Sequence, residues 1–166
     1  IINIVMKKDK RLGTNGSINT TLGQGIYFRN NSGINFNHRE KKFNVFGSYN
    51  YGTRTALNDL TINRSFFDNG QRTGGLDLFN HMVYPVDNHS ARLGFDYFAS
   101  SKTIIGILFN GLLNNQGKTV DNNSTITDAN GAPLSRFTTN SITKDKLDHY
   151  GINFNFKHTI DKKGQE

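Results

Sequence analysis

Apolar and polar residues alternate along several stretches of this 166-residue chain, with a period of two. In the range 16–29, Ile18, Leu22 and Phe28 occupy even positions, and the odd positions are mostly polar or glycine. Successive side chains of a strand point to opposite faces, so this pattern predicts β-strands with one apolar and one polar face. Further alternating runs occupy 34–39, 43–51, 92–98 and 147–160, and the run 103–114 is apolar at both parities.

Connections of two kinds separate these runs. The segments 39–42, 99–102 and 161–164 are short and charged or polar, which predicts tight turns. The segment 115–145 is rich in Asn, Thr and Ser and has no clean period, so we expect a long loop that is the least ordered part of the chain. The segment 53–90 is ambiguous, and two strand ends flanking a turn at 68–70 are one interpretation of it. We expect consecutive strands to pair antiparallel as a meander.

Composition narrows the class of protein. Only 34% of residues are hydrophobic, yet 11% are aromatic, with 13 Phe and 6 Tyr, which argues against simple disorder. The absence of Cys excludes disulfides and Cys-based zinc sites. No run of about 18 apolar residues is present, so the sequence predicts no transmembrane helix. The net charge of +7 permits contact with nucleic acid or anionic lipid headgroups but requires neither.

The polar positions favour a membrane barrel over a soluble sheet. They carry mostly Asn, Ser, Thr and Gly, while charged residues concentrate in the turns. Several runs exceed the usual strand length of about 5–6 residues and approach the ~9–11 that a tilted membrane strand needs. Aromatic residues near run ends are typical of the girdles at the two membrane interfaces. These residues are Tyr27, Phe28, Phe43, Tyr49, Tyr51, Tyr97 and Tyr150.

The alternation assigns side chains to the two faces of an antiparallel meander that forms part of a transmembrane barrel. The set expected on the outer, lipid-facing surface is Ile18, Leu22, Ile26, Ile34, Phe36, Val45, Leu93, Phe95, Ile105, Ile107, Phe109, Ile152, Phe154 and Phe156. The set expected on the inner, lumen-facing surface is Asn19, Thr21, Asn35, Asn44, Ser48, Asn50, Arg92, Asp96, Asn110, Asn153 and Asn155. Phe46 is an exception, because it falls on the polar side.

Short motifs resemble one known family in their order along the chain. Residues 1–8, Ile-Ile-Asn-Ile-Val-Met-Lys-Lys, resemble the last plug strand of TonB-dependent receptors. The segments 16–19, 44–51, 93–98 and 153–156 resemble the first barrel strands of one branch of that family. The resemblance implies that 1–12 is the end of a plug domain with its linker, and that 13–166 holds the first strands of an incomplete barrel. The chain is then an internal part of a longer protein.

The resemblance also implies a function and partners. Such receptors lie in the bacterial outer membrane and take up a scarce nutrient, such as a siderophore, a glycan or a peptide, with energy from the inner membrane. The partners would be outer-membrane lipid, the plug domain, the remaining barrel strands, and TonB through an upstream segment. A non-transport barrel, such as an adhesin or a porin-like channel, and a soluble all-β binding module remain alternatives.

Candidate catalytic and metal-binding motifs are weak. None of the five His residues forms a His-Glu-x-x-His pair, and no Gly-x-Ser-x-Gly elbow occurs. The segment 121–124 resembles a calcium loop only faintly, because the later Gly and Glu are missing. We therefore expect no enzyme activity, cofactor or metal. We also expect no nucleic-acid binding, because the aromatic residues share a face with Ile, Leu and Val rather than with Lys and Arg.

Overall fold

The computed structural model describes residues 12–160, and these form one six-stranded antiparallel sheet. The strands follow one another in the sheet in chain order, so the predicted meander is confirmed. No helix in this range is long and apolar enough to cross a membrane. The predicted plug end and the turn at 161–164 lie outside the described residues, apart from Leu12. The strands are β1 (Gly13–Gln24), β2 (Phe28–Arg39), β3 (Phe43–Asp68), β4 (Gln71–Phe98), β5 (Thr103–Thr127) and β6 (Pro133–His158).

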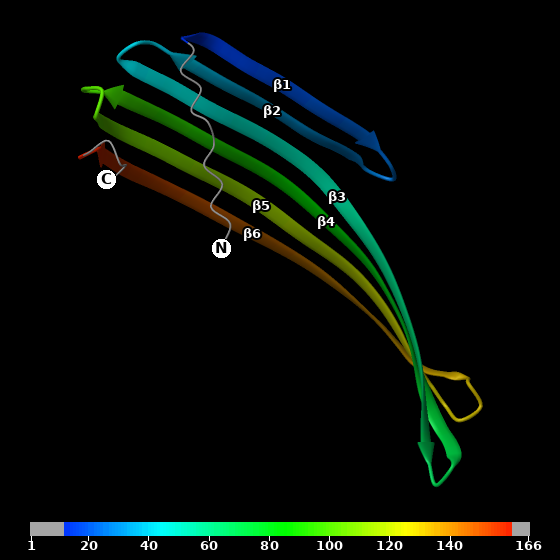
Figure 1. The fold of residues 1–166 in the computed structure, drawn as a ribbon. Helices are drawn as coiled ribbons and strands as arrows, with labels where there is room; N and C mark the ends of the chain where they lie inside the picture. The colour runs from blue at the N-terminus through cyan, green and yellow to red at the C-terminus, as the bar shows by residue number, and fades with distance from the viewer. Residues whose placement is uncertain (1–11, 161–166) are drawn as a thin grey trace.

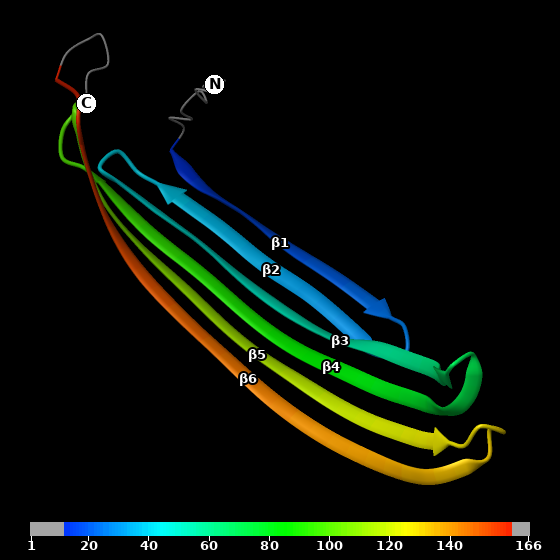
Figure 2. The same ribbon diagram turned by 90° about the horizontal axis from the view of Figure 1, so that it is seen from below.

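The sheet is a single curved layer, as Figures 1 and 2 show from two directions. Strands β1 and β2 have 12 residues each, while β3 to β6 have between 25 and 28. The four longer strands therefore continue past the first hairpin and form an arm, which ends in the β3–β4 and β5–β6 turns (Figure 1). The short turns that join β2 to β3 and β4 to β5 lie at the opposite end of the sheet.

The β3–β4 turn confirms the extended interpretation of 53–90. Asp68 pairs with Gln71, so only Asn69 and Gly70 connect the strands. Their φ angles are 45° and 81°, which is the left-handed conformation that a two-residue type I′ hairpin requires at both central positions. Asn and Gly adopt that conformation at the least cost. The two halves of the segment are therefore the outer ends of β3 and β4.

The prediction of a long loop at 115–145 is wrong. Strand β5 continues to Thr127 and β6 begins at Pro133, so only the short turn 128–132 connects them. In this turn the backbone N–H groups of Asn130 and Ala132 donate to Asp128 Oδ1 at 2.9 and 2.8 Å. Gly131 supplies the positive φ of 87°. An Asp-x-Asn-Gly turn was therefore present in a segment whose polarity indicated a loop.

The missing period in 115–145 has a physical cause. Hydrophobic alternation marks a strand only where one of its faces is apolar. In this segment both faces carry mostly polar or charged side chains, as Asn115 and Lys146 do on one face and Gln116 and Asp145 do on the other. The backbone ladder continues regardless of the side chains, because each N–H and C=O still finds a partner on the neighbouring strand.

The first alternating run is two strands rather than one. Strand β1 ends at Gln24, residues 25–27 form the turn, and β2 begins at Phe28. Ile26 therefore lies in the turn and not on the outer face, which corrects its expected placement. Gln24 pairs with Phe28, so both sides of the turn keep the same parity of facing. A hairpin with this spacing cannot be distinguished by period from a continuous strand.

The strand register confirms that the members of each predicted set share one face of the sheet, apart from Ile26. Directly paired residues of antiparallel strands share a face. Phe36 is paired with Gly47, Gly47 with Leu93, and Leu93 with Phe109, which places an apolar row across four strands. Apart from Ile26, every member of the predicted outer set lies on this face, here named the apolar face. All members of the predicted inner set lie on the opposite face, here named the polar face.

Aromatic rings of neighbouring strands pack over glycines of the central strands. On the polar face, a Cβ added to Gly94 would collide with the ring of Phe46. On the apolar face, a Cβ added to Gly47 would come within 2.6 Å of the Phe36 ring. The rings therefore lie flat across the glycines and shield the backbone there. This packing explains why Phe46 is found among polar side chains.

We expect Gly94→Val to destabilise the sheet, although Val favours strands, because the new side chain must displace the Phe46 ring. The expected loss is about 1–3 kcal/mol of unfolding free energy. The measurement is the urea midpoint of the refolded full-length protein in detergent micelles. Gly151→Val is the matched control, because Gly151 lies on the same face and a Cβ there meets no atom within 4 Å. Equal midpoints for the two variants would contradict the proposed packing.

Candidate functional site on the polar face

Amides and hydroxyls form cross-strand pairs along the polar face. The Asn37 amide donates to Asn44 Oδ1 at 3.1 Å, and the Asn35 amide donates to Ser17 Oγ at 3.3 Å. Farther along the arm, the Asn122 amide donates to Asn80 Oδ1 at 2.6 Å. These pairs satisfy polar groups within the sheet. Side chains on this face can still offer further donors and acceptors to a ligand.

The register brings most of the predicted inner residues into shared rows. One row holds Asn35, Ser48, Arg92 and Asn110, and a second holds Asn44, Asp96 and Asn155. The side-chain amides of Asn19 and Asn50 meet over Gly33, because a Cβ added there would contact both. Thr21 and Asn153 lie in other rows of the same face. The sequence prediction therefore identified one continuous polar surface.

The sheet curves toward the polar face. Along β5, Ile104, Gly106 and Leu108 on that face are buried or half-buried, whereas Ile105 and Ile107 between them are exposed. In a single layer, side chains on the concave side crowd one another and those on the convex side spread apart. We infer that the polar face is the concave one. A hollow on this side is consistent with that curvature.

The apolar face is bordered by aromatic rows at both ends. At the short-turn end, Phe43 pairs with Tyr97 across β3 and β4. At the other end, Tyr49 Oη lies 2.7 Å from His89 Nδ1, and the rings of Tyr51 and His89 are 4.8 Å apart. Aliphatic and Phe side chains fill the rows between these borders. Those side chains are Val45, Phe36, Phe95, Leu93, Ile107, Phe109, Phe154 and Ile152.

The bordered region has the length of a membrane-spanning band. From Phe43 to Tyr51, roughly nine residues cover about 27 Å along the strand at about 3.4 Å per residue. A tilt of about 40° reduces this to roughly 21 Å, close to the apolar band of about 25 Å that outer-membrane barrels present. Beyond Tyr51, β3 continues to Asp68 for roughly 58 Å more. The arm therefore begins where the apolar band ends.

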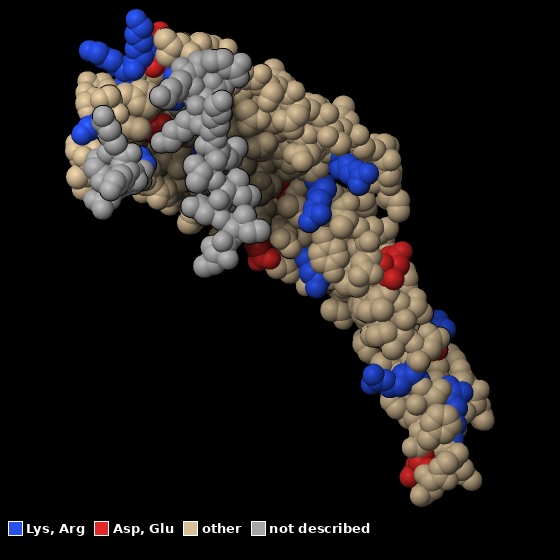
Figure 3. Space-filling model, in the orientation of Figure 1, with Lys and Arg blue, Asp and Glu red and all other residues tan. Residues whose placement is uncertain are grey.

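Charged residues separate by face along the arm. On β3 to β5, up to the bulge at Phe66 and Phe67, the convex face carries Asp59, Asp77, Asp87 and Asp121, whereas Arg54, Arg64 and Lys118 lie on the concave side. Beyond the bulge, the Arg72 side chain reaches the convex side next to Gly75. Figure 3 shows that charged side chains lie along the arm and at the short-turn end, while a broad part of the sheet between them carries few. The polar face thus becomes basic beyond the apolar band. Strand β6 departs from the pattern, because its concave side carries Asp145 and its convex side carries Lys144 and Lys146.

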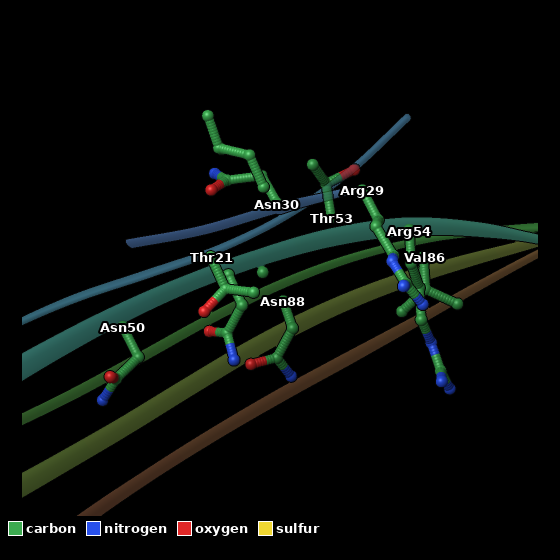
Figure 4. Close-up of a pocket in the computed structure, with 11 residues that line it drawn as sticks. Thr21, Arg29, Asn30, Asn50, Thr53, Arg54, Val86 and Asn88 are labelled. Atoms are coloured by element: carbon green, nitrogen blue, oxygen red, sulfur yellow. The ribbon is translucent and has the colours of Figure 1, made fainter. Parts of the chain in front are cut away.

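A hollow of about 440 Å³ lies where the polar face becomes basic. Its volume falls within the ~300–1,000 Å³ of typical small-molecule sites. Figure 4 shows Thr21, Asn50, Asn88 and the two arginines Arg29 and Arg54 extending to one side of the sheet. The remaining lining residues are Leu22, Asn30, Asn31, Gly52, Thr53 and Val86. Thr21 and Asn50 were among the predicted inner residues; Arg29, Arg54 and Asn88 were not, although their parity along the strands placed them on the same face.

Ion pairs in the arm lie at its surface. His81 Nδ1 is 2.7 Å from Asp59 Oδ1, and Lys146 Nζ is 2.9 Å from Asp148 Oδ2. The hydrogen bond to Asp148, and then its charge, raise the pKa of Lys146 above its ordinary value. Water screens exposed pairs of this kind, so they contribute little to stability. Within residues 12–160, no three His, Cys, Asp or Glu side chains gather closely enough to hold a metal ion.

Comparisons with protein-family models, with curated proteins and with solved structures find no match to this chain. The geometry of the sheet is therefore the basis for a functional assignment.

Proposed function

We propose that this chain is a segment of an outer-membrane β-barrel of the TonB-dependent receptor type, which takes up a nutrient across the outer membrane of a Gram-negative bacterium. The observation that carries the proposal is an apolar band with aromatic borders on one face of a sheet that has no hydrophobic core. None of the hydrophobic residues in the described range is buried. Phe154 is 80% exposed and Ile18 is 78% exposed.

The cost of leaving this face in water supports a lipid environment. Fully burying a Leu, Ile or Phe side chain contributes about 1.5–3 kcal/mol, so each half-exposed one forfeits about 1 kcal/mol. Roughly a dozen such side chains in the band forfeit on the order of 10 kcal/mol, which is comparable to the whole stability of an ordinary domain. Hydrocarbon covers such a face without a second protein layer. In this proposal the polar face lines the lumen.

The two ends of the sheet suggest its orientation. Outer-membrane barrels have short turns on the periplasmic side and longer connections outside the cell. The turns after β2 and β4 are short and follow the band directly, so they would face the periplasm. The arm formed by β3 to β6 would project from the cell surface. The hollow beside Arg54 would then lie at the outer mouth of the lumen, where a solute arrives first.

The free edges of the sheet suggest the remaining partners. β1 pairs only with β2 and β6 only with β5 among the described strands, so each presents an unpaired edge. Open edges do not occur in hydrocarbon, because unpaired N–H and C=O groups there cost several kcal/mol each. Further barrel strands would close these edges, and a plug domain would occupy the lumen. TonB would engage a segment outside this chain.

Cysteine labelling tests which face meets lipid, and these 166 residues contain no Cys that would compete for the label. In full-length receptor embedded in bilayers, we expect a fluorophore on Ile107→Cys to be quenched by lipid-attached nitroxide. We expect one on Asn110→Cys, on the other face of the same strand, to be quenched by water-soluble nitroxide instead. Equal lipid quenching at both positions, or no lipid quenching at either position, would contradict the barrel proposal.

The 166 residues alone should be insoluble or oligomeric in water, because two open edges and an uncovered apolar face promote association. The measurement is size-exclusion chromatography with light scattering, with and without detergent. A monodisperse monomer that unfolds cooperatively without detergent would support the soluble binding module instead.

The uptake mechanism is tested separately from the fold. We expect the full-length protein, extracted from the outer membrane, to bind the purified carboxyl-terminal domain of TonB, and to lose that binding when its upstream energy-coupling segment is deleted. The readout is a pull-down with a TonB-independent porin as the control. A full-length barrel that fails to retain TonB would favour the adhesin or porin-like alternative.

A further inference from the structure

We propose that Arg29 and Arg54 form a binding site for a small, multiply charged anion at the outer mouth of the lumen. The proposal rests on the proposed function, because it names the class of solute that the polar face receives. The shared chemistry is a cluster of carboxylate or phosphate oxygens on a dissolved solute.

The register places the two arginines at neighbouring positions of β2 and β3, on the same face. Asn30 of β2 pairs with Thr53 of β3, and Arg29 and Arg54 occupy the next position on each strand. Both therefore lie on the polar face, and Figure 4 shows their side chains running to the same side, away from Asn30 and Thr53. Like charges directly opposite each other destabilise a strand pair by roughly 0.2–1 kcal/mol. An anion bound in the hollow that both side chains line offsets that repulsion.

The surroundings of the pair complete an anion site. Thr21 and Asn88 lie in one row of the polar face, and Asn50 lies in the adjacent row. All three line the same hollow as the arginines and add hydroxyl and amide donors. Each guanidinium presents a planar fork that matches two oxygens of a carboxylate or phosphate. The Arg29 side chain lies across Gly23 of β1. A Cβ at this position would collide with it, so only glycine leaves room for this conformation of Arg29.

No described carboxylate neutralises the pair. Within residues 12–160, neither Arg29 nor Arg54 has an ion-pair partner. Asp145 lies on the same face, but Val86 of β4 and Gln116 of β5 separate it from Arg54. Three strand spacings of about 4.8 Å place it about 14 Å away, beyond the screening length of about 8 Å at physiological salt. The charge is therefore available to a solute.

The wider field of the arm favours the same class of solute. Lys118 lies one row from Arg54 on the concave side, with its ammonium 5.8 Å from the Tyr84 ring, and Arg64 lies farther out. Asp59, Asp77, Asp87 and Asp121 occupy the convex side of the arm. A concave surface lined by one sign of charge concentrates counter-charged solutes and speeds their arrival.

Calorimetric titration of the full-length receptor in detergent tests the site, with tripolyphosphate and citrate as the probes and spermidine as the cationic control. We expect both anions to bind at low salt and to weaken as salt increases, and spermidine not to bind. Tighter binding of tripolyphosphate assigns a phosphate-bearing solute, and tighter binding of citrate a carboxylate. The double variant Arg29→Gln/Arg54→Gln should weaken anion binding at least ~10-fold. Lys144→Gln/Arg136→Gln removes the same charge from the convex side and should leave binding unchanged.

The outcomes that overturn the site are distinct from those that overturn the barrel. Unchanged binding in the Arg29/Arg54 variant, an equal loss in the Lys144/Arg136 variant, or tighter binding of spermidine each overturns it. The variant Arg29→Lys/Arg54→Lys separates charge from geometry, because it should recover part of the affinity through charge alone. Lipid quenching of the fluorophore on Ile107→Cys, measured in each variant background, verifies the fold. Failure of that quenching when both arginines are present overturns the proposed function instead.

Discussion

The rest of this structure depends on one constraint: a single-layer sheet has no interior, so something outside it must cover its apolar face. The backbone is satisfied within the ladder, since each central strand has a partner on both sides. The side chains are not, because no hydrophobic residue of the described range is buried. Local packing, such as the Phe46 ring over Gly94, removes some backbone from water but does not supply a core. In the barrel that we propose, lipid would cover the apolar face and the polar face would line the lumen.

The same four strands carry two different kinds of surface along their length. In the band, one face is apolar and bordered by Tyr97 at one end and Tyr49 at the other. Past Tyr51 the ladder continues with mostly polar side chains on both faces, which suits strands surrounded by water. The transition occurs within continuous strands and without a loop. The arm is therefore held at a fixed position relative to the band, and its basic concave side continues the polar face.

The placement of charge along the arm follows from period two. Residues of opposite parity point to opposite sides of a strand. Asp59, Asp77, Asp87 and Asp121 at odd positions, and Arg54, Arg64 and Lys118 at even positions, therefore give the two faces of the arm different charges. No contact between the two sets is needed for this. Arg29 joins the basic side from β2, because the hairpin register places it next to Arg54. A group of like-charged side chains can therefore arise from the odd or even positions of residues along each strand and from the register between strands.

The sequence by itself determined the strand faces within the band, because hydrophobic alternation reports facing wherever one side is apolar. It also indicated the Asn69-Gly70 turn, since those residues tolerate positive φ. It did not reveal the strands of 115–145 or the turn at 25–27, because period carries no information where both faces are polar or where a hairpin preserves parity. Only the tertiary structure decided which strands are neighbours and in what register. The neighbouring positions of Arg29 and Arg54 on one face depend on that register, which backbone pairing and turn geometry determine across the sheet.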